Sequence, residues 1–290
     1  MFNCLLVGSS GNIGSEIKKI KSVNFICINR NTVDLLDFEK TEKYLDTLPK
    51  INSIIFLVGL AHNKGKKNDY QEHLKANYET LINLINVLKK NNSLPQKIIF
   101  TSTISIYGEN RWIKNYNEET VANPFSPYAV TKKMAEDYLS KYFENQSWIL
   151  RLAPVYKKDF LLNIMRRTKI LNFNYKIGSG NCKLSLCNIK NITTTVENIL
   201  LNKVPYGVYI ISDPLNYSYN DLLKWRKAKN IILVPRFAIL VFYYIGKLFK
   251  NTFIIENSIK LLTSNLYSSE KIRKHINLNH SLKNYEYEDG

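Results

Sequence analysis

The chain has 290 residues, of which 45% are hydrophobic, so it can bury a large core and is not expected to be disordered. Its net charge is +17, but the Lys and Arg residues are dispersed over many segments, with no arginine-rich block or recognised nucleic-acid motif. Nucleic acid is therefore not the expected partner, and a small phosphate-bearing ligand would need only a few of these charges.

The cysteines and the beginning of the chain indicate a cytoplasmic protein without a metal site. Cys4, Cys27, Cys182 and Cys187 form no Cys-x-x-Cys pair and have no neighbouring histidine at zinc-ligand spacing, which predicts reduced thiols. The first residues run directly into an apolar strand, without the basic and apolar regions of a signal peptide.

The first element is an apolar run from Phe2 to Val7, followed by a glycine-rich turn and a helical pattern through Lys21. A strand, a glycine turn and a helix in this order let backbone amides approach a pyrophosphate at a helix N-terminus. Three glycines at this spacing could also form a plain tight turn, but the position after the first strand favours dinucleotide binding. The candidate cofactor-binding residues in this turn are Gly8, Gly11, Asn12, Ile13 and Gly14.

Strands and helices then alternate along the first half of the chain. Further strands are expected at residues 24–28, 51–58, 98–102 and 148–152, and helices at 38–48, at 69–90 and around Tyr128. Continuous apolar strands alternating with helices predict an α/β fold with a doubly wound parallel sheet covered on both faces.

The second half is less regular. We expect helices at 160–170, 192–201 and 219–227, strands at 184–189 and 208–211, and a glycine-bearing loop at 178–180. The prediction is a dinucleotide-binding Rossmann domain at residues 1–155. Residues 156–290 would form a smaller, mainly substrate-binding α/β region, partly interleaved with the first domain.

The longest apolar run, Phe237 to Gly246, has ten residues, about half of the ~20 that a helix needs to cross a bilayer. We expect it to form a core helix. The alternative is an amphipathic patch on a membrane surface, flanked by Arg236, Lys247 and Lys250.

A proton-transfer set is predicted from Thr103, which closes an expected strand, and from Tyr128 and Lys132, which lie four residues apart on one face of an expected helix. A neighbouring ammonium is expected to lower the pKa of the phenol from its reference value of about 10, which would make Tyr128 a usable general base. The same spacing occurs at Tyr243/Lys247 and Tyr267/Lys271, but only Tyr128 combines a preceding turn with an upstream strand ending in hydroxyl residues.

These motifs together resemble the extended short-chain dehydrogenase/reductase family, within it the nucleotide-sugar epimerases and 4-ketoreductases of surface-polysaccharide pathways. The resemblance rests on Gly8-x-x-Gly11-x-x-Gly14, Thr103-x-x-x-Tyr107-Gly108, Tyr128-x-x-x-Lys132 and Arg151-x-x-x-Val155-Tyr156. It implies a nicotinamide dinucleotide as cofactor and a nucleotide-diphosphate sugar as substrate.

The resemblance also implies roles for individual residues. Tyr128 would be the general acid and base, Lys132 would hold the nicotinamide ribose, and Thr103 would bind the reacting sugar oxygen. Asn77 matches an asparagine that organises the site in this family, although it could be an ordinary polar helix residue. Ile104-Ser105 stands where the family's 4,6-dehydratases have Asp-Glu, which disfavours dehydration.

Two departures from the family pattern concern ligand phosphates. The second strand ends without the acidic residue that commonly binds the adenosine ribose of NAD, and Arg30 could instead meet the extra phosphate of NADP. Leu184 stands about where sugar-nucleotide epimerases often have a phosphate-binding arginine, so Lys183, Arg166 or Arg167 would have to substitute. Lys158, in the loop after Tyr156, is the third candidate substrate-binding residue, with a solvated charge as its alternative.

The sequence therefore predicts an enzyme that transfers hydride at C4 of a UDP- or dTDP-linked hexose, of the epimerase type. The alternatives are a 4-keto-sugar reductase that uses NADPH, a reductase of small carbonyl compounds, and a dinucleotide-binding redox sensor without catalysis. A homodimer and peripheral contact with a membrane are left open.

Overall fold

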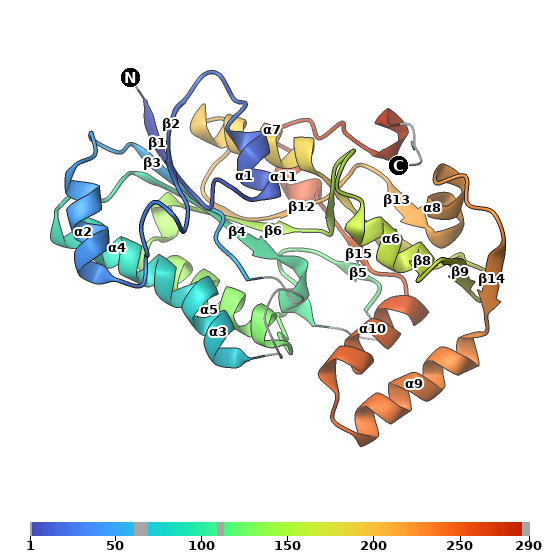
Figure 1. The fold of residues 1–290 in the computed structure, drawn as a ribbon. Helices are drawn as coiled ribbons and strands as arrows, with labels where there is room; N and C mark the ends of the chain where they lie inside the picture. Colours follow the sequence, from blue (N-terminus) through green and yellow to red (C-terminus); the bar gives the residue numbers. More distant parts are fainter. Residues whose placement is uncertain (1, 61–68, 109–112, 286–290) are drawn as a thin grey trace. The chain divides into compact units, whose positions relative to one another are not determined.

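A computed structural model describes residues 2–60, 69–108 and 113–285 and contains a six-stranded sheet, in the order β12-β6-β4-β3-β1-β2 (Figure 1). The strands are β1 (Asn3–Val7), β2 (Asn24–Ile28), β3 (Ser53–Phe56), β4 (Lys97–Thr103), β6 (Ser147–Leu152) and β12 (Gly207–Ile211). β1 is parallel to both β2 and β3, and β3 is parallel to β4. The predicted parallel, doubly wound sheet is confirmed.

The strand order places a topological switch at β1. The chain leaves β1 toward β2 on one side and reaches β3 on the other, so the connections on the two sides diverge at the carboxyl end of β1. In open α/β sheets, ligands bind in the crevice at such a point.

The helices associated with this sheet are mostly short. They are α1 (Asn12–Ile17), α2 (Phe38–Asp46), α3 (Tyr70–Leu74), the π-helix η1 (Lys75–Glu79), α4 (Thr80–Lys90), α5 (Pro127–Tyr142), the 3₁₀ turns η2 (Ile104–Tyr107) and η3 (Glu144–Gln146), and α7 (Ile189–Leu200). Local sequence explains where α5 begins: the Ser126 hydroxyl accepts from the Ala129 amide, and Pro127 takes the first helical position.

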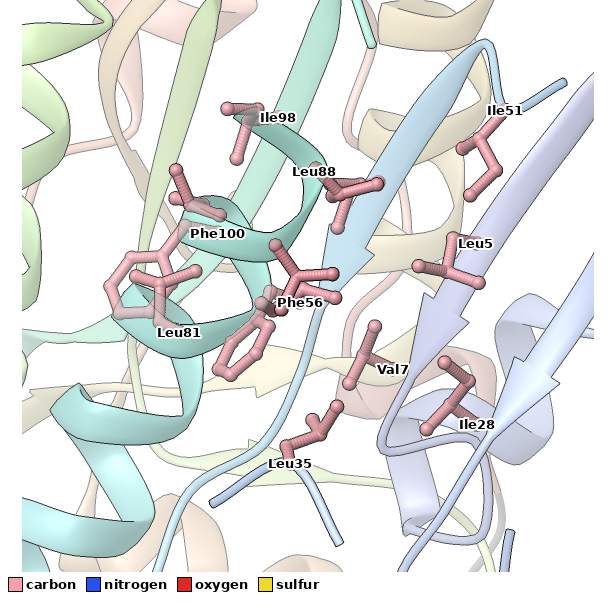
Figure 2. Packing of buried hydrophobic residues seen from close by; sticks show 14 of the residues in the cluster. Leu5, Val7, Ile28, Leu35, Ile51, Phe56, Leu81, Leu88, Ile98 and Phe100 are labelled. Atoms are coloured by element: carbon pink, nitrogen blue, oxygen red, sulfur yellow. The ribbon is translucent and has the colours of Figure 1, made fainter. Parts of the chain in front are cut away.

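The core beneath these helices forms because alternate strand residues point to the same face. Figure 2 shows Val7 and Phe56 of neighbouring strands together with Phe100 of β4, and Leu81 and Leu88 of α4 packed against them. All five side chains are buried. The opposite strand positions are buried as well, as expected for a parallel sheet covered on both faces.

The single helix expected at residues 69–90 is interrupted. α3 and α4 are joined by the π-helix η1, whose wider turn contains Asn77. Single π turns inside α-helices occur frequently at functional sites, because the extra residue re-aims the side chains of one turn.

The chain forms two compact units. The first comprises Met1–Ile106, Pro124–Arg151 and Thr193–Tyr209, and the second comprises Tyr107–Asn123, Leu152–Ile192 and Ile210–Gly290. Segments distant in sequence therefore belong to the same unit, and each unit is described separately below.

The second unit consists of small sheets and short helices. β7 pairs with β11, β10 with β13, β5 with β15, and β9 lies between β8 and β14. The strands are β5 (Asn115–Tyr116), β7 (Val155–Tyr156), β8 (Lys169–Ile170), β9 (Phe173–Ile177), β10 (Lys183–Ser185), β11 (Cys187–Asn188), β13 (Asn216–Ser218), β14 (Ile231–Val234) and β15 (Leu266–Tyr267). The helices are α6 (Leu162–Thr168), α8 (Tyr219–Trp225), α9 (Arg236–Leu248), α10 (Thr252–Leu262), α11 (Glu270–Arg273) and the 3₁₀ turn η4 (Leu282–Asn284).

Two expected elements of this half have different bounds. The strand expected at 184–189 is divided into β10 and β11, which pair with different partners, and α7 already begins at Ile189. The helix expected at 160–170 ends at Thr168, because the next two residues pair with β9 as β8.

The apolar run Phe237 to Gly246 does form a helix, α9, but the expectation of a core helix is contradicted. Only Tyr243 and Gly246 of α9 are buried, and its large apolar side chains are mostly exposed. Among the described residues, no helix is both long and apolar enough to cross a membrane.

Candidate functional site

The glycine turn after β1 is held against two neighbouring strands. Gly8 has φ +88°, and its amide donates to the carbonyl of Ile28 at the end of β2 over 2.9 Å. A Cβ at Gly8 would lie 3.1 Å from the backbone nitrogen of Val58, which follows β3. The backbone conformation and this close approach both require glycine.

Gly14 lets α1 pack directly on this turn. A Cβ at this position would lie 2.7 Å from the carbonyl oxygen of Gly8 and 2.8 Å from the Cα of Ser9. Both neighbours are backbone atoms, which cannot rotate away as a side chain could. Gly14 therefore fixes the distance between the turn and the helix.

The N-terminus of α1 fits a pyrophosphate. Gly11 precedes the helix, no side chain caps the first amides, and a Cβ at Gly11 would meet only the Gly8 carbonyl oxygen, at 3.5 Å. Asn12 and Ile13 form the first turn of α1. The open space beside uncapped amides suits the dinucleotide that the three-glycine pattern predicts.

Arg30 is exposed and lies two residues past the end of β2. Because the Ile28 carbonyl accepts from the amides of both Gly8 and Ser9, the end of β2 and the glycine turn share one edge of the sheet. A guanidinium in this position can bind a phosphate on the adenosine ribose, as the sequence suggested.

Thr103, Tyr128 and Lys132 all belong to the first unit, and the structure joins Thr103 to Tyr128. Tyr128 lies in the first turn of α5, and its phenol forms a hydrogen bond with the hydroxyl of Thr103 at the end of β4. Lys132 follows one turn later and is buried. Its Nζ donates to the carbonyl oxygens of Val58 and Thr101, both at 2.9 Å.

The electrostatics of this set differ from the expectation that Lys132 lowers the pKa of the phenol. Burial raises the pKa of Tyr128, and the Thr103 hydrogen bond only partly opposes this. Burial also lowers the pKa of Lys132 to about 7, with the nearby Glu136 carboxylate opposing the shift. The expectation fails because desolvation of both side chains dominates and the Lys132 ammonium is directed at backbone carbonyls.

The two other Tyr-x-x-x-Lys pairs lie in different surroundings. Tyr243 and Lys247 are on α9, with the Lys247 ammonium 5.1 Å from the centre of the Tyr243 ring. Tyr267 belongs to β15 and Lys271 to α11, so that pair does not share a helix. Tyr128/Lys132 shares its unit with β4, which ends in Thr101, Ser102 and Thr103.

Asn77 is fully buried in the π-helix and connects three segments of the first unit. Its Oδ1 accepts from the Leu60 amide at 2.6 Å, and its Nδ2 donates to the Thr131 hydroxyl at 3.0 Å. Nδ2 also lies 3.3 Å from Nδ1 of His73. Asn77 thus ties the segment after β3 to α5, which carries Tyr128 and Lys132.

Sequence reasoning assigned no role to four polar residues around this set. Thr131 and His73 hydrogen bond with Asn77, and the His73 ring lies 6.2 Å from the Tyr128 ring. Glu136 forms a buried ion pair with Arg151, the closest N–O distance being 2.7 Å. One signal was available: Glu136 lies one turn beyond Lys132 on the Tyr128 face of the helix.

The three candidate substrate-binding residues belong to the second unit and are exposed. Lys158 follows β7, Arg166 lies in the last turn of α6, and Lys183 begins β10. The pKa of Asp221 is lowered mainly by hydrogen bonds from Ser218 and in smaller part by the charge of Lys183.

A buried carboxylate organises the interior of the second unit. Asp213 accepts hydrogen bonds from the hydroxyls of Tyr156 (2.6 Å) and Tyr217 (2.9 Å). It also accepts from the Asn188 amide (2.6 Å) and from Nδ2 of Asn191 (3.0 Å). Burial raises the pKa of Asp213 to about 6, and these hydrogen bonds oppose the shift. Asp213 therefore fixes Tyr156, part of the Arg151-x-x-x-Val155-Tyr156 motif.

Asp213 also lines a cavity of about 440 Å³ that the sequence did not indicate. Arg273 lies on the same wall and donates from Nη2 to the Asp213 carbonyl oxygen at 2.8 Å. The rings of Tyr116 and Tyr267, which also line the cavity, stack with centres 5.0 Å apart. Its volume lies in the range of small-molecule sites.

Comparison with known proteins adds a family match. A profile described as "NAD dependent epimerase/dehydratase family" matches residues 4–171. An Escherichia coli O157:H7 protein named N-acetyl-alpha-D-glucosaminyl-diphospho-ditrans,octacis-undecaprenol 4-epimerase is 22% identical, over 76% of this chain and 70% of that protein.

Two further proteins are similar. The dTDP-D-glucose 4,6-dehydratase of Dictyostelium discoideum is 25% identical over 76% of this chain but only 60% of its own length. The structure of the UDP-glucose 4-epimerase of Thermus thermophilus in complex with NAD has a TM-score of 0.69 and 19% identity, covering 94% of this chain and 93% of that one. This likeness shows that the fold is shared.

Proposed function

The chain belongs to the NAD-dependent epimerase/dehydratase family and is an NAD(P)-dependent enzyme, and from this premise we propose that it transfers hydride at C4 of a diphosphate-linked hexose as a 4-epimerase. The observation that carries the proposal is the hydrogen bond between Tyr128 and Thr103 one helical turn from a buried lysine. Such a pair can hold an alcohol oxygen and exchange its proton.

Gly8, Gly11, Gly14 and Lys132 would hold the dinucleotide. When bound, its nicotinamide supplies the carbon that accepts hydride and returns it. The fit rests on the open space at Gly11 and on the helix N-terminus that Gly14 brings against the turn.

The protein's own contribution is to move one proton. In oxidation, Tyr128 must first lose its own proton, and the resulting phenolate oxygen then accepts the C4 hydroxyl proton as the C4–H bond breaks and its electron pair leaves as hydride. In reduction, the phenol returns that proton to the ketone oxygen. Thr103 orients the oxygen, and the raised pKa of Tyr128 keeps the resting phenol protonated, which suits the reducing step.

Asn77 and the Glu136–Arg151 pair would position this set. Asn77 holds the segment after β3 against α5, and the carbonyl of Val58 in that segment accepts from Lys132. Arg151 compensates the Glu136 charge one turn below Lys132. Loss of either contact would move the lysine without removing a reacting group.

The substrate is proposed as a UDP- or dTDP-linked hexose. Lys158, Arg166 and Lys183 are the candidate contacts for its diphosphate. The name of the E. coli relative adds a diphospho-polyprenol-linked hexose to the same chemical class, since both carry a sugar on a diphosphate.

A second candidate function, a 4-keto-sugar reductase that uses NADPH, is favoured by Arg30. No acid stands at the end of β2, and an exposed guanidinium is available there for the extra phosphate. A reductase must exchange its cofactor in every turnover, whereas an epimerase regenerates it.

The experiment first denatures purified protein and identifies any released dinucleotide. Native protein is then incubated with UDP-sugars, dTDP-sugars and undecaprenyl-diphosphate N-acetylglucosamine, with and without NADPH, and products are followed by mass and NMR. Interconversion of C4 epimers without added NADPH supports the epimerase. Oxidation of NADPH only with 4-keto sugars supports the reductase. Inactivity across the panel, with dinucleotide still bound, would replace both with a sensor.

A further inference from the structure

We propose that α9 docks the protein onto the surface of an anionic lipid bilayer. α9 begins at Arg236, directly after Pro235, and turns at Asn251 into α10 (Figure 1). This surface belongs wholly to the second unit and concerns binding, so the inference does not depend on the reaction proposed above.

The two helices pack against each other as a hairpin. A Cβ at Gly246 would lie 3.0 to 3.1 Å from Ile254 and Ile255 of α10, which shows how closely the helices pack. The Asn251 amide donates to the Gly246 carbonyl at 2.8 Å, and its side chain caps α10. At the other end of the helix, Arg236 donates to the Leu262 carbonyl at 2.7 Å. α9 is thus held at both ends.

The outer side of α9 is a continuous apolar face. Phe237, Val241, Tyr244 and Leu248 recur at spacings of three and four residues, so they lie along one side of the helix. Their side chains are 53 to 77% exposed, and Phe249, just past the helix end, is 73% exposed. The opposite side carries Tyr243 and Gly246, which are buried. A helix that packs one side and exposes large apolar groups on the other indicates an interaction surface.

The positive charge of this part of the chain indicates which partner binds the apolar face of α9. From residue 222 to residue 255 the chain contains no Asp or Glu, and its exposed basic residues are Lys224, Lys227, Lys229, Arg236, Lys247 and Lys250. Of these, Arg236 and Lys247 belong to α9 and Lys250 follows its end. An apolar helix face flanked by Lys and Arg in this way is typical of helices that lie in the interface of anionic membranes. A second copy of the same face would bring these positive charges together, which disfavours self-association.

The first test is cosedimentation of the full-length protein with lipid vesicles. We expect binding to vesicles that contain phosphatidylglycerol, little binding to phosphatidylcholine alone, and weaker binding as salt is added, because salt screens the basic residues. Failure to bind the anionic vesicles would overturn the proposal. So would salt-independent binding to both lipids.

The second test asks whether vesicle binding depends on the apolar face of α9 and not on exposed apolar residues elsewhere on the surface. Leu248→Glu with Phe249→Glu should reduce vesicle binding at least tenfold. The matched control, Val121→Glu with Leu201→Glu, changes the charge equally at residues that are 85% and 50% exposed, and should bind like wild type. Unchanged thermal unfolding of both variants shows that they fold. Equal binding by the two double variants would overturn the proposal.

The third test addresses the basic residues and the rival occupant. Lys247→Gln with Lys250→Gln should weaken binding by roughly 25-fold, at about fivefold per lysine near an anionic surface. Lys18→Gln with Lys21→Gln, which are exposed in the first unit, should leave it unchanged. A doubled mass in light scattering that Leu248→Glu with Phe249→Glu abolishes, without vesicle binding by wild type, would assign the face to a second copy.

Discussion

At the residue scale, Tyr128 is the group on which the proposed chemistry depends. Tyr128→Phe removes the only proton-carrying atom of the side chain and one hydrogen bond to Thr103. We expect the turnover rate to fall at least ~100-fold, the usual contribution of a general acid or base, while stability changes by about 1 kcal/mol.

Steady-state rates and urea unfolding check this prediction. The matched control is Tyr142→Phe at the end of the same helix, where the side chain is 55% exposed. A Tyr128→Phe enzyme that keeps more than a tenth of the wild-type rate would remove the residue from the mechanism.

Lys132 should make stability depend on pH. In the folded protein its pKa is lowered to about 7, whereas the unfolded chain keeps the ordinary value of 10.5. Between these values the unfolded state binds more protons, so the free energy of unfolding should rise with pH, by at most about 1.4 kcal/mol per pH unit.

The measurement compares wild type with Lys132→Met by urea unfolding at several pH values between 7 and 9, without cofactor. The stability difference should move in favour of wild type as the pH rises. Lys133→Met, the next residue of α5, should show no such trend. A flat difference for Lys132→Met would mean that the buried lysine keeps its ordinary pKa.

At the scale of elements, the glycine turn and α1 depend on one close backbone contact. Gly14→Ala would place a Cβ 2.7 Å from the Gly8 carbonyl oxygen, so the helix or the turn must shift. We expect a stability loss of about 1–3 kcal/mol, as for overpacked interiors, together with weaker dinucleotide binding.

Gly11→Ala provides the contrast. Gly11 has φ −73°, which alanine adopts freely, and its Cβ would meet only one atom, at 3.5 Å. Unfolding curves and calorimetric titration with NAD and NADPH should show lost affinity without lost stability. A Gly14→Ala protein as stable as wild type would show that the turn is not fixed by this contact.

Other elements show how much local sequence could reveal. The glycine turn and the beginning of α5 could be predicted because the residues that specify each of them lie within a few positions of one another. The π-helix around Asn77 could not be predicted in this way. The groups that bind the Asn77 side chain, the Leu60 amide and the Thr131 hydroxyl, lie 17 and 54 residues away. The bounds of β10 and β11 also depended on distant strands.

At the scale of the whole molecule, a cofactor that binds only the folded state should raise the unfolding temperature. At a concentration of 100 times its dissociation constant the stabilisation is about 2.7 kcal/mol. We expect NADPH to stabilise the protein more than NADH at equal concentration, because Arg30 is available for the extra phosphate.

Thermal unfolding with each cofactor, in wild type and in Arg30→Ala, tests this expectation. The variant should lose the difference between NADPH and NADH, and its stability without cofactor should not change because the side chain is exposed. Equal shifts by the two cofactors in wild type would assign Arg30 to the solvated surface.

The sequence by itself determined the parallel sheet, the family and the use of NAD(P), and these predictions are confirmed. Alternating apolar strands, three spaced glycines and a Tyr-x-x-x-Lys pair are short-range patterns, and one architecture satisfies them all. The roles given to Tyr128 and Lys132 stay predictions.

Only the tertiary structure decided the surroundings of these residues. Burial reversed the expected pKa direction of Tyr128, since desolvation depends on side chains that fold over it from elsewhere in the chain. The tertiary structure also decided the place of α9, because its apolar sequence favoured a core helix but its large side chains are mostly exposed. Hydropathy measures what a side chain would gain from leaving water. Whether an apolar side chain is buried against other apolar side chains depends on the rest of the fold.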